Sequence, residues 1–178
     1  MVQQINGKEV KEKIFQYLEE KGPSLPIPVA KHMSMNTLFV SAFLSEMAAD
    51  GMIKISDMKV GGSPLYYSPN KIALLENFIS FLGGKERESC QLLKEKGILN
   101  DEEQHPAIRV ALRSLKDFAV SFKNDDKIYW RYFLVSEEEV RKKFEENKKL
   151  PEIKKEELIG PTPSIVPETK PQIEEKIH

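Results

Sequence analysis

The chain lacks most of what secreted proteins and enzymes need, beginning with cysteine, of which Cys90 is the only one in 178 residues. A single cysteine excludes an internal disulfide framework and favours a reducing compartment. The N-terminal stretch MVQQINGKEV has no apolar signal core, and no apolar run approaches the length that crosses a bilayer. We therefore expect a cytoplasmic protein without membrane contact.

The residue patterns of catalytic and metal sites are missing as well. His32, His105 and His178 are dispersed, and Cys90 has no partner at metal-ligand spacing. Neither of the phosphate-binding patterns G-x-x-x-x-G-K-[ST] and G-x-G-x-x-G occurs. Cys90 lies within a helical pattern, where an inert thiol is the favoured interpretation. The sequence predicts no enzyme, no catalytic residue, no metal and no cofactor.

An excess of one charge is also lacking, because the formal net charge is −1. No global basic excess indicates nucleic-acid binding, although a local basic patch is compatible with this balance. Hydrophobic residues make up 40% of the chain and charged residues 31%, which is typical of a soluble globular protein. The length suits one medium domain or two small ones.

Apolar residues recur at helical spacing three times early in the chain, at about 8–21, 28–33 and 36–51. Two runs with the alternation of β-strands follow, MIKISDMKV and PLYYS, separated by Gly61-Gly62. Three helices followed by a hairpin is the element order of a winged helix-turn-helix.

A fourth helix, at about 70–82, leads to Gly83-Gly84, which we interpret as a hinge, and the pattern then repeats. Three further helices are predicted for KERESCQLLKEKG, LNDEEQ and HPAIRVALRSLKDF. FAVSF and KIYWRYFLV predict a hairpin around Asn124-Asp125-Asp126, and SEEEVRKKFEENKK predicts a closing helix. The predicted fold class is α+β, mainly helical, with two winged-helix units in tandem over residues 1–82 and 83–149.

The last segment, residues 150–178, has a different composition. Prolines stand among Lys, Glu, Ser and Thr, and isoleucines are scattered. Such a segment cannot bury enough apolar surface to offset the entropy of ordering it, so a disordered tail is predicted. Ile165-Val166 could form a short docking motif, but an inert tail is the favoured interpretation.

Two stretches, KISDMKVGGSPLYYSPNK and HPAIRVALRSLKDFAV with the following YWRYFLVSEEE, resemble archaeal tandem winged-helix proteins of poorly defined function. The resemblance covers roughly residues 8 to 146. It implies the tandem fold and no catalytic activity.

The third helix of the first unit has an uncharged outer face. At 100° per residue, Val40, Phe43, Leu44 and Met47 fall on the side that should face the core. The opposite side holds Leu38, Ala42, Ser45 and Ala49. Without Arg, Lys, Asn or Gln this face is poorly suited to reading bases, and it favours packing against another helix or the second domain.

The corresponding helix of the second unit carries positive charge. Arg109, Arg113 and Lys116 recur at helical spacing beside an apolar stripe, where they could meet phosphates along a groove. The alternative is a solvated face whose cations pair with nearby Asp or Glu.

The two hairpins supply the remaining candidates for phosphate contact. They are Lys54, Lys59, Gly61, Gly62, Ser63 and Lys71 around the first hairpin, and Arg131 in the second. One of Tyr66 and Tyr67 should point inward and the other outward, and Trp130 is expected in the core. A purely structural hairpin is the alternative for the first.

Our hypothesis from sequence is a non-enzymatic protein that binds double-stranded DNA mainly through backbone contacts, as a transcription or chromatin-associated factor. The alternative is a protein-interaction scaffold with a protein partner or a homodimer, supported by the near-zero charge and by the face of Leu38, Ala42, Ser45 and Ala49.

Overall fold

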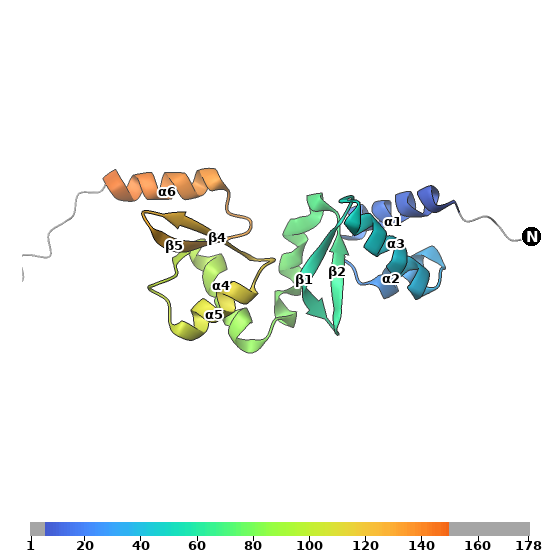
Figure 1. Cartoon of the computed structure of the whole chain (residues 1–178), viewed down its shortest axis with the longest axis horizontal. Helices are drawn as coiled ribbons and strands as arrows, with labels where there is room; N and C mark the ends of the chain where they lie inside the picture. Colours follow the sequence, from blue (N-terminus) through green and yellow to red (C-terminus); the bar gives the residue numbers. More distant parts are fainter. Residues whose placement is uncertain (1–5, 150–178) are drawn as a thin grey trace, which may run out of the picture.

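A computed structural model of the chain describes residues 6–149, with side chains described up to residue 146. The chain is α+β and mostly helical, as predicted (Figure 1). The predicted tail, residues 150–178, lies outside the described residues.

The first unit has three helices followed by a hairpin. They are α1 (Gly7–Lys21), α2 (Pro26–Met33), α3 (Thr37–Ala49), β1 (Lys54–Val60) and β2 (Ser63–Tyr67). Asn6 and Asn36 cap α1 and α3, because their side-chain oxygens accept hydrogen bonds from the first-turn amides of Lys8 and Leu38. Gly61 and Gly62 turn the hairpin with φ of 59° and 86°, values that glycine adopts without a steric penalty. The predicted element order is confirmed here.

The core of the first unit forms where the apolar faces of α1 and α3 meet. Each helix contributes three buried side chains at helical spacing: Val10, Ile14 and Leu18 from α1, and Val40, Leu44 and Met47 from α3. Phe43 is half-buried beside them. The predicted inner face of α3 is therefore confirmed.

The predicted linking helix is a 3-10 helix, η1 (Pro69–Phe81). It buries Leu75 and Ile79, with Phe78 half-buried, whereas Ile72 is 40% exposed. Its start is fixed on α1, because the Ser68 hydroxyl and the Asn70 amide both donate to the Glu19 carboxylate.

The second unit combines three helices with a three-stranded antiparallel sheet. Its elements are α4 (Gly84–Lys96), β3 (Ile98–Asn100), α5 (Pro106–Ser114), β4 (Ala119–Asn124), β5 (Lys127–Tyr132) and α6 (Glu137–Lys149). The strand order is β3-β5-β4. Ser136 and Glu139 form the predicted capping box at the start of α6.

The predicted short helix at LNDEEQ is wrong. Its first residues instead form β3, where Leu99 lies opposite Trp130 of β5. A tight turn follows, in which the Asn100 side chain accepts a hydrogen bond from the amide of Glu102. Pairing with a strand far along the chain and the local Asn100 turn compete with helix formation over these few residues.

The hairpin β1–β2 lies between the two cores, and Figure 1 shows it standing between α1–α3 and the linking helix. Successive side chains of a strand point to opposite faces. Tyr66 belongs to the core of the first unit, and Leu65 and Tyr67 belong to the core of the second. The two tyrosines are only 6% and 5% exposed, so the expectation that one of them points outward is wrong.

Asp117, just beyond α5, holds the second unit against β1. The register of the hairpin shifts between Ile55 and Lys59, which leaves backbone amides of β1 without a partner on β2. The Asp117 carboxylate accepts two of them, from Asp57 at 3.0 Å and from Met58 at 2.7 Å. The core of the second unit therefore continues across residues 82 and 83, where the sequence suggested a domain division.

This shared core predicts a coupled unfolding transition. Leu65 in β2 is 1% exposed and packs in the cluster that contains Trp130, the only tryptophan of the chain. Replacing Leu65 by Ala should cost about 2–5 kcal/mol and lower the denaturant midpoint reported by Trp130 fluorescence. The matched control is Leu38→Ala, at a leucine that is 75% exposed, and it should leave the midpoint nearly unchanged. If Leu65→Ala left the denaturant midpoint reported by Trp130 unchanged, the two halves would unfold independently.

Candidate interaction surfaces

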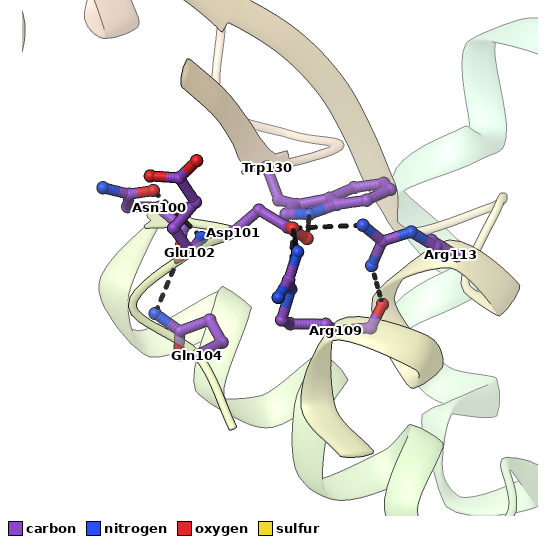
Figure 2. A network of polar contacts seen from close by, with 7 residues as sticks. All are labelled: Asn100, Asp101, Glu102, Gln104, Arg109, Arg113 and Trp130. Atoms are coloured by element: carbon purple, nitrogen blue, oxygen red, sulfur yellow. Dashed lines mark hydrogen bonds and ion pairs between the residues drawn. The ribbon is translucent and has the colours of Figure 1, made fainter. Parts of the chain in front are cut away.

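The arginines of α5 are bound to a buried carboxylate (Figure 2). The side chain of Asp101 is 1% exposed. Its Oδ1 accepts a hydrogen bond of 2.8 Å from Trp130 Nε1. Its Oδ2 accepts from Arg109 Nε at 2.8 Å and from Arg113 Nη2 at 3.0 Å. Two of the three predicted phosphate anchors are thus held by an internal anion.

The local fold explains why these groups meet. Asp101 comes directly after β3, and its amide donates to the carbonyl of Ile128 at the start of β5. Arg109 and Arg113 are one helical turn apart on α5, and both reach the same carboxylate oxygen. Arg113 also donates to the Arg109 carbonyl and lies with its guanidinium carbon 5.9 Å from the centre of the Trp130 ring.

The electrostatics of Asp101 follow from this arrangement. Burial opposes its ionisation and is the largest single influence on its pKa. The hydrogen bonds from Trp130, Arg113 and Arg109 together outweigh burial, so the pKa of Asp101 lies below its ordinary value. The carboxylate is charged at neutral pH and depends on these three donors, since a buried charge without partners is strongly destabilising.

Lys116 and Arg131 also have partners within the chain. Lys116 Nζ lies 3.0 Å from a carboxylate oxygen of Asp57 in β1, so this cation spans the two units. Arg131 donates to the carbonyl of Val135 at 2.6 Å and lies 3.9 Å from the Glu137 carboxylate. These contacts fit the alternative expected from sequence, in which the cations pair with carboxylates. The partners, Asp101 and Asp57, are not the acidic residues nearest to the cations in the sequence.

The first hairpin is open at its tip and along part of β1. Lys54 at the start of β1 and Lys59 near the tip are exposed, and no ion pair is found for either within residues 6–149. A Cβ placed on Gly61 or Gly62 would meet no heavy atom within 4 Å. Ser63 at the tip and Lys71 on η1 are half-buried. Leu65, Tyr66 and Tyr67 of β2 serve the two cores, whereas the tip and several side chains of β1, among them Lys54, Ile55 and Lys59, reach into solvent.

The outward face of α3 is exposed along its whole length. Leu38 is 75% exposed, and Ala42, Ser45 and Ala49 are exposed as well. Docking of this face against the second domain, one of the alternatives from sequence, is not found in the described part of the chain. Sequence reasoning missed Phe39, which is 60% exposed beside this face. The 100° projection could not decide its exposure, because it places Phe39 about midway between the core side and the outward face.

Other reactive groups are few in the described part of the chain. Cys90 has no exposed surface, and burial raises the pKa of its thiol to about 11. Among residues 6–149 no cluster of His, Cys, Asp or Glu is arranged to hold a metal ion. Within the same residues no helix has the length and apolar character needed to span a membrane.

Comparison with family models, with curated proteins and with solved structures finds no match to this chain. The resemblance to archaeal tandem winged-helix proteins therefore stays a prediction from sequence.

The buried carboxylate predicts a pH-dependent stability. Asp101→Asn should destabilise the fold by about 1–3 kcal/mol at neutral pH, because the arginines lose an anionic acceptor. A lowered pKa in the folded state stabilises the fold above the unfolded pKa of about 4, and this stabilisation is lost as pH falls through the folded value. The difference in the free energy of unfolding between wild type and Asp101→Asn, measured by chemical denaturation, should therefore become smaller at acid pH.

The matched control for this experiment is Asp126→Asn at an exposed turn residue with φ of 62°, a conformation that Asn tolerates. It should change stability little at any pH. If the difference in the free energy of unfolding between wild type and Asp101→Asn stayed constant from neutral to acid pH, this would contradict a charged Asp101.

Proposed function

We propose that this chain is a non-enzymatic protein-interaction module that binds another protein through the outward face of α3. One observation carries the proposal: this face is exposed from Leu38 to Ala49 and has apolar or small side chains along its centre. Contiguous exposed apolar surface marks interaction sites, and Leu38, with Phe39 beside it, supplies large exposed apolar side chains here.

Two winged-helix units in tandem are part of this proposal. The order of three helices and a hairpin in the first unit supports it, and so does the helix-strand-helix-hairpin order of the second with its β3-β5-β4 sheet. In such a unit the helix before the hairpin is the one that reads DNA bases. Here the outward face of α3 presents no Arg, Lys, Asn or Gln, and the arginines of α5 are bound to Asp101. Both observations count against base reading by these helices, and the exposed face of α3 favours a protein partner.

Binding of double-stranded DNA is the second candidate, favoured by Lys54 and Lys59 of the first hairpin, which are exposed and have no ion pair within residues 6–149. Exposed lysines of a hairpin can contact phosphates without reading bases. This candidate relies on the hairpin alone, since Arg109, Arg113 and Lys116 already have carboxylate partners.

Site-specific photo-crosslinking tests the protein-binding proposal. A photoreactive amino acid replaces Ala42 on the α3 face or, as the matched control, Ala73, an exposed alanine of η1. In cells that express the full chain we expect a protein adduct from position 42 and none from position 73. Equal labelling at the two positions, or no adduct at position 42, would contradict the proposal.

A salt titration separates the second candidate from the first. We expect no measurable anisotropy change for wild type with random duplex DNA at physiological salt. If backbone binding occurs, log affinity falls with log salt by about 0.9 per phosphate contact. Lys54→Ala with Lys59→Ala should then flatten the slope by about two units, while Arg109→Ala should leave it unchanged. Wild-type binding with this response would establish the DNA candidate in place of the protein-binding one.

A further inference from the structure

Strand β4 forms an edge of the sheet in the second unit, because within residues 6–149 it pairs with β5 alone. On its other side β5 bonds toward β3, through the carbonyl of Ile128 and the amide of Tyr132. The alternate residues of β5 therefore bond to β4. The β4 residues opposite them are Val120, Phe122 and Asn124. The backbone N–H and C=O groups of Ser121 and Lys123 consequently point away from the sheet, where a further strand can pair with them.

A groove of about 480 Å³ runs along this edge, and residues 120–124 line it together with one face of α6. Figure 1 shows α6 lying beside the β4–β5 hairpin. The apolar part of the groove includes Phe122 of β4 and Val140 and Phe144 of α6. The rings of Phe122 and Phe144 meet edge to face at 6.1 Å between centroids. A free strand edge beside an apolar groove is the arrangement to which an extended peptide adds as a new strand.

The last segment of the chain contains a sequence that suits such a strand. Residues 158–167 are the longest uncharged run within residues 150–178, and they include Ile165-Val166, noted above as a candidate docking motif. An uncharged run can enter an apolar groove without removing an ion from water.

The prolines of this segment follow the alternation of a strand. All of them stand at odd-numbered positions: Pro151, Pro161, Pro163, Pro167 and Pro171. Successive residues of a strand direct their N–H groups to opposite edges, so every proline would fall on the same edge. Proline is accepted in a strand where its missing N–H faces solvent. The even-numbered residues keep an unbroken set of N–H groups for pairing with a neighbour.

The direction of α6 fixes the direction of a strand that follows it. Glu137, at the start of α6, lies 3.9 Å from Arg131 near the end of β5. Phe144 lies 5.0 Å from the ring of Tyr129, closer to the hairpin turn. Helix α6 therefore runs in the same direction as β4, and a chain that turns back after it passes β4 antiparallel. Residues 150–161, as a tether, reach roughly 20 Å, which is also the length of a six-residue strand.

We propose that residues 162–168 of this chain add to the free edge of β4 as an antiparallel strand. Ser164 lies opposite Lys123 and Val166 lies opposite Ser121, so the inward N–H and C=O groups of each pair bond to one another. The occupant of the groove is thus a segment of the same chain. Its tether places it at an effective concentration in the millimolar range, so a weak contact suffices.

This register also places the side chains. Ile165 lies opposite Phe122, on the same face of the sheet, and enters the groove beneath Phe144. Pro163 and Pro167 fall on the new outer edge, where they withhold the N–H groups with which another strand would pair. The docked segment therefore protects the sheet from edge-to-edge association.

Amide hydrogen exchange of the full chain, followed by NMR at two protein concentrations, tests the strand. The amides of Ser121 and Lys123 should exchange about tenfold more slowly in wild type than in Val166→Pro, because that variant loses an inward N–H group. Thr169→Pro is the matched control: it adds a proline at an odd-numbered position and should leave the protection of both amides unchanged.

A second pair of variants tests the groove. Ile165→Asp places a carboxylate against Phe122 and should also abolish the protection of Ser121 and Lys123. Ile173→Asp makes the same change beyond the docked residues and should retain the protection. The denaturant midpoint reported by Trp130 shows that each variant keeps the fold of the second unit.

Three results would overturn the proposal. The first is exchange of Ser121 and Lys123 in wild type as fast as in Val166→Pro. The second is an equal loss of protection in Val166→Pro and Thr169→Pro, which would contradict the alternation. The third is protection that increases with protein concentration, which would assign the added strand to a second copy of the chain. Photo-crosslinking at position 42 tests the α3 face separately, so the proposed function stands or falls independently of these results.

Discussion

The end of strand β2 is buried on both faces, and much of the molecule depends on how the chain meets this constraint. Tyr66 fills the core beneath α1–α3, while Tyr67 fills the core that reaches α5 and β5. The register shift in β1 frees two amides, and Asp117 of the second unit accepts both. A hairpin held in this way fixes the second unit against the first. The buried part of β2 cannot also lie on a ligand, whereas the glycine tip and the exposed side chains of β1 stay available.

Positive charge on α5 illustrates how cations on a helix face can be paired with an internal carboxylate. Arg109 and Arg113 have the spacing of phosphate contacts, yet their guanidinium groups keep Asp101 ionised inside the protein. Both are still partly exposed, but moving either onto a phosphate would leave a buried carboxylate with fewer donors. Binding DNA through them would therefore compete with the stability of the fold, which weakens the DNA hypothesis more than the net charge does.

The sequence predicted what local periodicity determines and missed what distant residues determine. The inner face of α3, the capping box before α6 and the glycine turn of the hairpin all follow from spacings within a few residues. Strand β3 and the partners of Asp101 do not, because Trp130 lies 29 residues from Asp101. The contact of Asp117 with Asp57 spans 60 residues. Among the candidate sites, the exposed α3 face was predictable, and pairing of the cations of residues 109–116 was expected as an alternative, but their particular partners, Asp101 and Asp57, were not.

Folding alone does not account for the outward face of α3. The core requires Val40, Leu44 and Met47, which lie on the opposite side of the helix and are fully buried. Leu38 and Phe39 add nothing to that core, since 75% and 60% of their surfaces are exposed. Charged side chains at these two positions would favour solubility at little cost in packing. Because the fold would tolerate such residues, the apolar surface of α3 calls for an explanation outside the monomer, and contact with another protein supplies one.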